Sequence, residues 1–432
     1  MKWSLYALLL GSFLDLLIGD PHGFPHPVIA IGKLISVLER FFRRLCPKTA
    51  RGEILAGGLI WFFTAAISAA VPVLLLFAAQ RVSVYLRLAL ESVMCWQILA
   101  AKSLQGESMK VYAALKTATL PDAQKAVSMI VGRDTERLDE PGVARAAVET
   151  VAENTSDGVI APLFYLALGG AGLGFFYKAV NTMDSMLGYV EPPYKHVGLI
   201  PAKLDDVFNF IPARLSALFL LAAGVLLHLD VKNGWQMFKR DRYKHASPNS
   251  AQTESVCAGL LGLRLAGDAW YHGVLHKKDF IGDAKREISP EDIPRACRLM
   301  YAAAALALFS EKGYDTVSVG EIAGAVGIKA PSLYNHFPSK QAIFDAIVEA
   351  TAMQYEQDTD KIAIHVQDVG RDVSQFAAIT EEGLLEKVRQ IFDYSLHNET
   401  IRRFRRMMTM EQFRSPALAA LYSRRYVDRM VA

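Results

Sequence analysis

Three carboxylates recur at four-residue spacing just before a long uncharged stretch. They are Glu149, Glu153 and Asp157, and the uncharged stretch is residues 159–177. Residues four apart lie on one side of a helix, so we expect these carboxylates to point the same way. The uncharged stretch is long enough to cross a bilayer as a helix. Carboxylates at a membrane edge are unfavourable unless they meet a cation, so chemistry is expected here.

Two further polar clusters follow on predicted helices. Lys178, Asn181 and Asp184 are spaced by three, so one helical face offers a cation, an amide and a carboxylate. The adjacent Asp205 and Asp206 are hard oxygen donors of the kind that magnesium prefers. Taken singly, an acidic pair is more often a solvated surface than a site.

A third cluster is cationic. Arg214 lies just inside the apolar run 215–229 and needs an anionic partner, either a carboxylate or a phosphate. Residues 239–254, KRDRYKHASPNSAQTE, are basic and end in a turn before a helix predicted to run through 258–267. Backbone amides at such a helix start can bind phosphate oxygens. Because the three clusters alternate with apolar runs, we predict one composite pocket for a large anionic substrate.

Composition indicates a multi-pass membrane protein. The chain has 432 residues, 52% of them hydrophobic and 21% charged, and its apolar residues are concentrated in blocks. The net charge of +3 is too small to indicate nucleic-acid binding by itself. The four cysteines are far apart, which predicts isolated buried thiols and neither a zinc site nor a disulfide framework.

Membrane segments are expected at 3–19, 54–79, 159–177 and 215–229. Residues 86–104 are interrupted by Glu91 and Lys102, so they form either a further span or a helix packed inside the bundle. A proline-rich loop at 19–33 carries His22 and His26, which either contact a phosphate or metal or are simply polar loop groups. The basic helix that follows places Arg40, Arg43 and Arg44 near anionic lipid and favours the cytoplasmic side.

Five motifs in order carry a resemblance over residues 1–294. They are GDPHGFPHPV, AENTSDGVIAPLFY, YKAVNTMDSMLGY, KLDDVFNFIPARL and RDRYKHASPNS. This part of the chain resembles the cobinamide-phosphate synthase family of cobalamin biosynthesis (CobD/CbiB). The resemblance implies a multi-pass helix bundle in the cell membrane. It also implies an ATP-dependent ligase that joins adenosylcobyric acid to aminopropanol phosphate through an amide bond.

The resemblance also implies roles for the polar clusters. A carboxylate is a poor electrophile, so ATP must first convert it to an acyl phosphate, with Mg²⁺ and cationic side chains stabilising the transferred group. Asp205 and Asp206 would bind magnesium, and Glu153 or His245 would take a proton from the amine. The full catalytic set is Glu153, Asp157, Asp184, Asp206 and His245. The substrate-binding set is Lys178, Asn181, Lys203, Arg214, Arg240, Arg242 and Asn249.

Residues 295–345 have a different character. They are predicted to form short helices, with a capping box at Ser318 and Glu321 and a turn at Gly327. With the stretch LYNHFPSK, this segment resembles the helix-turn-helix of TetR-family regulators. The resemblance implies contacts to base edges from Lys329, Ala330, Pro331 and Ser332, and contacts to DNA phosphates from Tyr334, His336 and Lys340.

The junction leaves three interpretations open. The apolar run 299–309 is only half a bilayer long and can hardly serve both as a span and as a soluble core helix. Residues 346–432 correspond to a truncated TetR-type C-terminal region, through which such regulators form homodimers. The preferred fold is all-α, a multi-pass membrane helix bundle followed by a soluble helix-turn-helix domain on the cytoplasmic side. The alternatives to such a ligase are a membrane-tethered regulator that senses a corrinoid, and a chimeric reading frame whose last part has no function.

Overall fold

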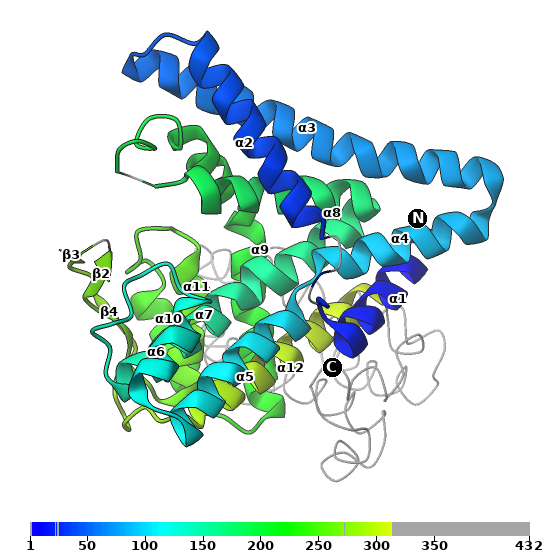
Figure 1. Cartoon of the computed structure of the whole chain (residues 1–432). Helices are drawn as coiled ribbons and strands as arrows, with labels where there is room; N and C mark the ends of the chain where they lie inside the picture. The colour runs from blue at the N-terminus through cyan, green and yellow to red at the C-terminus, as the bar shows by residue number, and fades with distance from the viewer. Residues whose placement is uncertain (1, 22, 24–25, 190, 272, 313–432) are drawn as a thin grey trace, which may run out of the picture. The chain divides into compact units, whose positions relative to one another are not determined.

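The described part of the chain is built mostly of helices, as the sequence predicts for its membrane part (Figure 1). The structure, a computed structural model, describes residues 2–21, 23, 26–189, 191–271 and 273–312. In chain order the helices are α1 (Lys2–Ile18), α2 (Pro27–Leu45), α3 (Ala50–Val82), α4 (Val84–Ile98), α5 (Ala101–Thr117), α6 (Leu120–Ser128), α7 (Glu140–Asn154), the π-helix η1 (Thr155–Ile160), α8 (Ala161–Leu187), α9 (Leu199–Leu226), α10 (Val231–Asp241), α11 (Ser250–Leu261) and α12 (Asp292–Lys312).

Polar side chains define where the key helices begin. Thr49 Oγ1 accepts a hydrogen bond from the Gly52 amide at 3.2 Å, which starts α3. Asp139 Oδ1 accepts one from the Gly142 amide at 2.8 Å, which starts α7. Pro141 lies in the first turn of α7, where its missing N–H has no consequence. Proline at this position is a local signal of a helix start.

Four helical stretches in the described part of the chain are long and apolar enough to cross a membrane. The predicted span 54–79 is the middle of α3. The stretch 86–104, which the sequence left open, lies mostly in α4 and continues after a break at Leu99 and Ala100 into α5. The apolar helix at Trp3–Ile18 is shorter than the others. The four long stretches are Ala50–Val82, Val84–Thr117, Glu140–Leu187 and Leu199–Leu226.

The continuous helical stretch from α7 through η1 to α8 departs from regular α-helix at two places. The π-helix η1 replaces one turn of α-helix at Thr155–Ile160. Further on, Gly169 and Gly170 leave the helical conformation, and Gly170 has a φ of +60°, which strongly favours glycine. A side chain at Gly170 would also meet the carboxylate of the buried Glu91 on α4. The uncharged stretch 159–177 is therefore bent within the bundle.

Helix α9 joins two features that the sequence suggests are separate. The acidic pair Asp205–Asp206 and the apolar run beginning at Leu215 belong to one continuous helix. Beside it, α11 is buried along its whole length, polar residues included. Helices α10 and α11 approach closely because Gly234 and Gly259 face each other without side chains. Polar groups on α9 and α11 are thereby held inside the protein.

Two small antiparallel ladders follow α11, where the sequence predicted more helix. That prediction is wrong beyond Leu261, because Gly262 adopts a left-handed conformation (φ +68°) that ends the helix. The strands are β1 (Leu265–Ala266) paired with β4 (Phe280–Ile281), and β2 (Ala269–Tyr271) paired with β3 (Val274–His276).

Helix α12 closes the described part of the chain. The Tyr301 hydroxyl donates a hydrogen bond to Gln105 Oε1 on α5 at 2.9 Å, and residues 302–307 are buried. The described residues through Ala307 belong to one compact unit. The predicted helix-turn-helix, including Ser318, Glu321 and Gly327, lies outside the described residues. Within them, Cys95, Cys257 and Cys297 are buried free thiols, as predicted, and Cys46 is a half-buried one.

Candidate functional site

The three carboxylates that the sequence placed in a row have different surroundings. Glu149 is paired within the fold, whereas Glu153 and Asp157 belong to the candidate site. Glu149 is held by Arg133, with Nη2 to Oε2 at 2.6 Å, and accepts a hydrogen bond from the Ala266 amide at 2.6 Å. Glu153 accepts a hydrogen bond from Ser250 Oγ at 2.8 Å, at the start of α11. Asp157 lies in η1, whose wider turn interrupts the four-residue repeat. The prediction that all three share one face assumes a regular α-helix, and the π-helical turn at Asp157 departs from that geometry.

A hydrogen-bond chain connects η1, α8 and α9. The Tyr177 hydroxyl donates to Asn209 Oδ1 at 2.7 Å and lies 3.2 Å from the Asp157 carbonyl oxygen. Asn209 Nδ2 in turn donates to Asp205 Oδ2 at 3.0 Å, and Asn181 also contacts the Asp205 carboxylate. Amide side chains from α8 and α9 thus hold the Asp205 carboxylate.

The loop before α11 holds the second aspartate. Ser247 Oγ donates to Asp206 Oδ1 at 3.1 Å, and Asn249 Nδ2 donates to the Asp206 carbonyl at 2.9 Å. Arg214 Nη1 contacts Asn249 Oδ1 at 3.3 Å. Asn249 therefore connects the acidic side of the cluster to a cation.

His245 lies at the same loop and is half-buried. Its Nδ1 accepts a hydrogen bond from the Ser247 amide at 3.1 Å, which leaves Nε2 as the nitrogen able to carry a proton. Burial lowers the pKa of His245 below its ordinary value, although the negative charge of Glu153 opposes this shift. The shift favours the neutral imidazole, the form able to accept a proton.

The carboxylates of the cluster lie near one another. Asp157 lies within Coulombic range of Asp205, Glu153 and Asp184, and Asp184 lies within range of Asp206. Among the described residues, no ion pair involves Asp157, Asp184 or Asp205. Asp205 is also buried, and its Oδ1 has no hydrogen-bond partner there. Such an arrangement is unfavourable without a cation from outside the protein.

These residues fit a magnesium ion that is shared with a phosphate. No three His, Cys, Asp or Glu side chains in the described segments converge closely enough to enclose a metal by themselves. Magnesium commonly binds one or two protein carboxylates and completes its shell with substrate phosphates and water. The unpartnered Asp205 Oδ1 is an oxygen donor of this type.

The N-terminal loop reaches the same region through Lys178. This lysine lies within Coulombic range of Asp20, Asp157 and Asp15, and no hydrogen bond or ion pair engages its amine among the described residues. Burial raises the pKa of Asp20, but hydrogen bonds from His26 and Ser103 outweigh this effect and hold it below its ordinary value. His26 is thus engaged by Asp20, at 3.4 Å, while His22 lies outside the described residues.

The predicted phosphate-binding cations do not all reach the cluster. Arg242 lies near Arg214, and its guanidinium stacks on the Phe238 and Tyr243 rings. Lys203 is exposed, 4.0 Å from Asp206. Arg240, in contrast, is committed to Asp241 and Asp283 in a separate network.

Sequence reasoning missed several polar members of the site. Tyr177, Ser247 and Ser250 were not singled out. Ser247 and Ser250 donate hydrogen bonds to Asp206 and Glu153, and Tyr177 donates one to Asn209, which in turn donates to Asp205. Glu254 was also missed. Burial raises its pKa well above the ordinary value, and the charge of Glu153 adds to the shift. Its signal in the sequence is a lone charge within the run of small residues AQTESVCAGL. The predicted DNA contacts Lys329, Ala330, Pro331, Ser332, Tyr334, His336 and Lys340 lie beyond the described residues.

Comparisons with known proteins give two family matches. The sequence model described as "CobD/Cbib protein" matches residues 8–300, and that of "Bacterial regulatory proteins, tetR family" matches residues 302–347. The cobalamin biosynthesis protein CobD of Clostridium perfringens is 46% identical over 286 residues, which cover 66% of this chain and 90% of that protein. The cobalamin biosynthesis protein CbiB of Salmonella typhimurium is 44% identical over 308 residues, which cover 71% of this chain and 95% of that protein. No solved structure matches the chain.

Proposed function

The chain belongs to the CobD/CbiB protein family, and on this basis we propose that residues 1–294 catalyse an ATP-dependent amide ligation in cobalamin biosynthesis. The proposed reaction joins adenosylcobyric acid to aminopropanol phosphate and yields adenosylcobinamide phosphate. The names of the relatives support the pathway. The reaction itself is inferred from the five motifs and from the chemistry of the site.

A separation of charge carries this proposal. Asp157, Asp184 and Asp205 form no ion pair with a protein cation among the described residues, and Arg214 and Arg242 form none with a protein carboxylate there. Asn249 lies between the two sides, since it contacts both Asp206 and Arg214. A site that binds a metal ion on one side and phosphate groups on the other requires this division.

Amide formation needs an activated acid and a deprotonated amine. When bound, magnesium–ATP would supply its γ-phosphoryl group to the substrate carboxylate, giving an acyl phosphate and releasing ADP. The amine nitrogen then attacks the acyl carbon, the carbon–oxygen bond to phosphate breaks, and inorganic phosphate leaves. One proton from the amine must pass to a base.

The chain supplies groups for each of these requirements. Asp205 and Asp206 would hold the metal, and Arg214 with Arg242 would bind phosphate oxygens. The start of α11 adds backbone amides beside Arg214. His245 is the proposed base: as a neutral imidazole it can take a proton at Nδ1, the nitrogen that accepts the hydrogen bond from the Ser247 amide. Lys178 offers a further cation beside Asp157.

The direct test is product formation by the full chain in membranes supplied with ATP, Mg²⁺, adenosylcobyric acid and aminopropanol phosphate. Replacing Asp206 with Asn should abolish the product while the protein remains in the membrane. Asp283→Asn is a matched control, because Asp283 pairs with Arg240 outside the cluster. Wild-type turnover by Asp206→Asn would remove Asp206 from the mechanism, and no product from the wild-type chain would refute the reaction.

A second proposal concerns the TetR-family match at residues 302–347. We propose that this segment binds DNA, with Lys329 and Ser332 at base edges. The match begins inside α12, whose residues 302–307 are packed in the unit formed by the preceding helices. A footprint on DNA upstream of the gene by the full chain would support regulation. Its absence from a dimeric preparation would favour a chimeric reading frame.

A further inference from the structure

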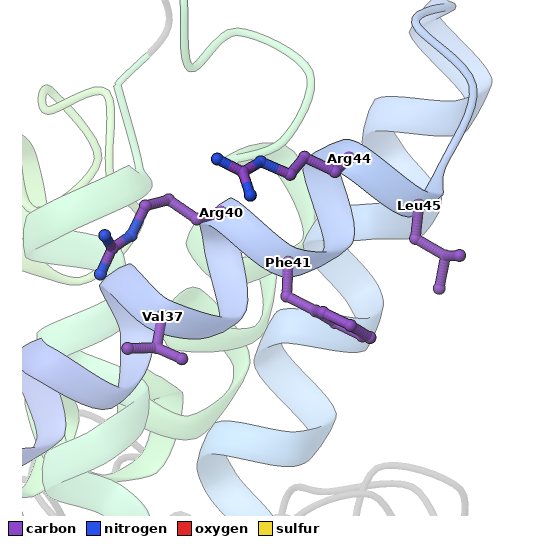
Figure 2. A pocket seen from close by; sticks show the side chains of 5 residues that line it. All are labelled: Val37, Arg40, Phe41, Arg44 and Leu45. Carbon is purple, nitrogen blue, oxygen red and sulfur yellow. The ribbon is translucent and has the colours of Figure 1, made fainter.

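Helix α2 presents an exposed face with two kinds of side chain. Val37, Phe41 and Leu45 follow one another at four-residue spacing and are 52%, 57% and 67% exposed. Arg40 and Arg44 project beside this apolar stripe, in a different direction (Figure 2). The two arginines and the three apolar residues together line a hollow of 470 Å³. A cationic pair beside an exposed apolar stripe is unusual on a surface that meets only water.

The arginines of α2 differ in their partners. Arg43 is fully engaged, since it contacts Glu39 at 3.0 Å, the Pro193 carbonyl at 3.0 Å and Glu53 at 3.7 Å. Arg40 makes one hydrogen bond, from Nε to the Ser36 carbonyl, and no ion pair engages Arg40 or Arg44 in the described part of the chain. Arg43 therefore stabilises the fold, whereas the other two guanidinium groups are free to bind an external anion.

The neighbouring helix α3 indicates where this face lies relative to the membrane boundary. Its charged residues Arg51 and Glu53 precede an uncharged run at 54–80 that is long enough to cross a bilayer. The charged end of α3 therefore marks the membrane boundary. The contact between Arg43 and Glu53 brings the last turns of α2 to the same boundary. Lipid phosphates lie at this level, and long basic side chains extend toward them.

The inner face of α2 is already covered. Phe42 is buried, and its ring stacks on Phe63 of α3 with centroids 5.5 Å apart. Ile31 and Ile35 are buried on the same helix. The face that carries Arg40, Phe41 and Arg44 consequently points away from the bundle, toward the surroundings of the protein.

We propose that this face is a binding site for an anionic glycerophospholipid. Arg40 and Arg44 bind the negatively charged headgroup, and Val37, Phe41 and Leu45 contact its acyl chains. A soluble phosphate would use the arginines but not the apolar stripe, whereas a zwitterionic lipid would use the stripe but gain less from the arginines. The site is independent of the proposed ligase reaction, because none of its residues contributes to the carboxylate cluster.

Lipid retention by the purified full chain tests this site. The chain in detergent is given equal amounts of phosphatidylglycerol and phosphatidylcholine with identical acyl chains, and retained lipid is counted by native mass spectrometry. Each basic residue near an anionic surface contributes about fivefold in affinity. Arg40→Gln/Arg44→Gln should therefore lower the preference for phosphatidylglycerol by roughly 25-fold. Arg40→Lys/Arg44→Lys, which keeps both charges, should retain most of it.

The matched control is Lys110→Gln/Lys125→Gln, which removes two exposed charges from α5 and α6. It should leave the preference unchanged, and an equal loss in this control would overturn the site by showing an effect of net charge alone. Unchanged preference in Arg40→Gln/Arg44→Gln would also overturn it. Phe41→Ser should weaken retention of both lipids. Full displacement of phosphatidylglycerol by free glycerol phosphate would reveal a soluble ligand and reject the lipid.

Discussion

Asp205 and Asp241 are both buried carboxylates, yet only Asp241 is surrounded by cations. Asp241 receives the Arg240 guanidinium at 2.7 Å, the Lys244 amine at 2.8 Å and the Gly282 amide at 2.7 Å. Asp205 has amide donors on one oxygen and no partner on the other among the described residues.

This difference separates structural carboxylates from candidate functional ones. A buried charge that is paired and hydrogen-bonded stabilises the fold it is part of, while an unpaired one persists only where a ligand or substrate uses it. Asp292 follows the Asp241 pattern, because Arg286 and Arg295 both contact it. Asp157 and Asp184 follow the pattern of Asp205. Both groups consist of carboxylates. What distinguishes them is whether the protein itself supplies a cationic partner, as it does for Asp241 and Asp292.

The largest expected effect is on activity at the unpaired cluster. Asp205→Asn should lower product formation by roughly 10³-fold, because the metal loses a ligand that stabilises the transferred phosphoryl group. The same change removes repulsion among Asp157, Asp184 and Asp205, so the unfolding temperature should stay equal or rise. Activity assays and thermal unfolding of the same preparation measure both. A lower unfolding temperature with normal activity would place Asp205 in the structural class.

His245→Gln should lower turnover by about 10²-fold while keeping the fold. Because burial depresses its pKa, His245 stays neutral until the pH is below 6.5, the ordinary histidine value. Its inhibition by protonation should therefore begin only at more acidic pH. The measurement is kcat/KM against pH for both proteins. If the variant retained the same acidic decline as the wild type, His245 would not be the base.

At the paired carboxylate Asp241, a substitution should lower stability and leave turnover nearly unchanged. Asp241→Asn should lower the free energy of unfolding by roughly 3 kcal/mol, because it weakens contacts to Arg240, Lys244 and the Gly282 amide. Turnover per folded molecule should change little. Denaturant titration of the full chain, with the exposed Asp268→Asn as control, gives the comparison. Equal stability of both variants would contradict the structural role of Asp241.

The smallest effect is the pH dependence of that same network. Burial raises the pKa of Asp241, but hydrogen bonds from Arg240 and Lys244 outweigh it and lower the pKa to about 2. The carboxylate releases its proton more readily in the folded than in the unfolded state, so its stabilisation is complete above about pH 4. It is lost as the pH falls toward 2. Asp241→Asn should lack this part of the acid destabilisation, and an identical acid profile would speak against it.

Much of the fold follows from local sequence. The uncharged run in α3 identified a span, and Pro141 identified the start of α7, because hydrophobicity and proline geometry act over one or two helical turns. The π-helix η1 and the left-handed Gly262 were not predicted. Both depend on packing with neighbouring elements, so helical periodicity extended too far at each.

The junction near residue 300 shows the same limit. The sequence indicates that the apolar run 299–309 suits two incompatible roles. The structure packs residues 302–307 with the preceding helices, where Tyr301 reaches Gln105 on α5. The two family matches meet inside this one helix, at residues 300 and 302. Composition alone does not choose between the two roles, because both require alanine- and leucine-rich helix.

The sequence by itself determined which residue types carry chemistry and which runs are apolar enough for a membrane, since both are properties of a residue and its near neighbours. Only the tertiary structure decided which charges are neutralised. Glu149 pairs with Arg133, 16 residues away, and Arg240 pairs with Asp283, 43 residues away, as well as with the adjacent Asp241. Glu153 accepts its hydrogen bond from Ser250, 97 residues away. Such pairs form only when helices and loops pack, because electrostatic stabilisation depends on distance in space and on burial.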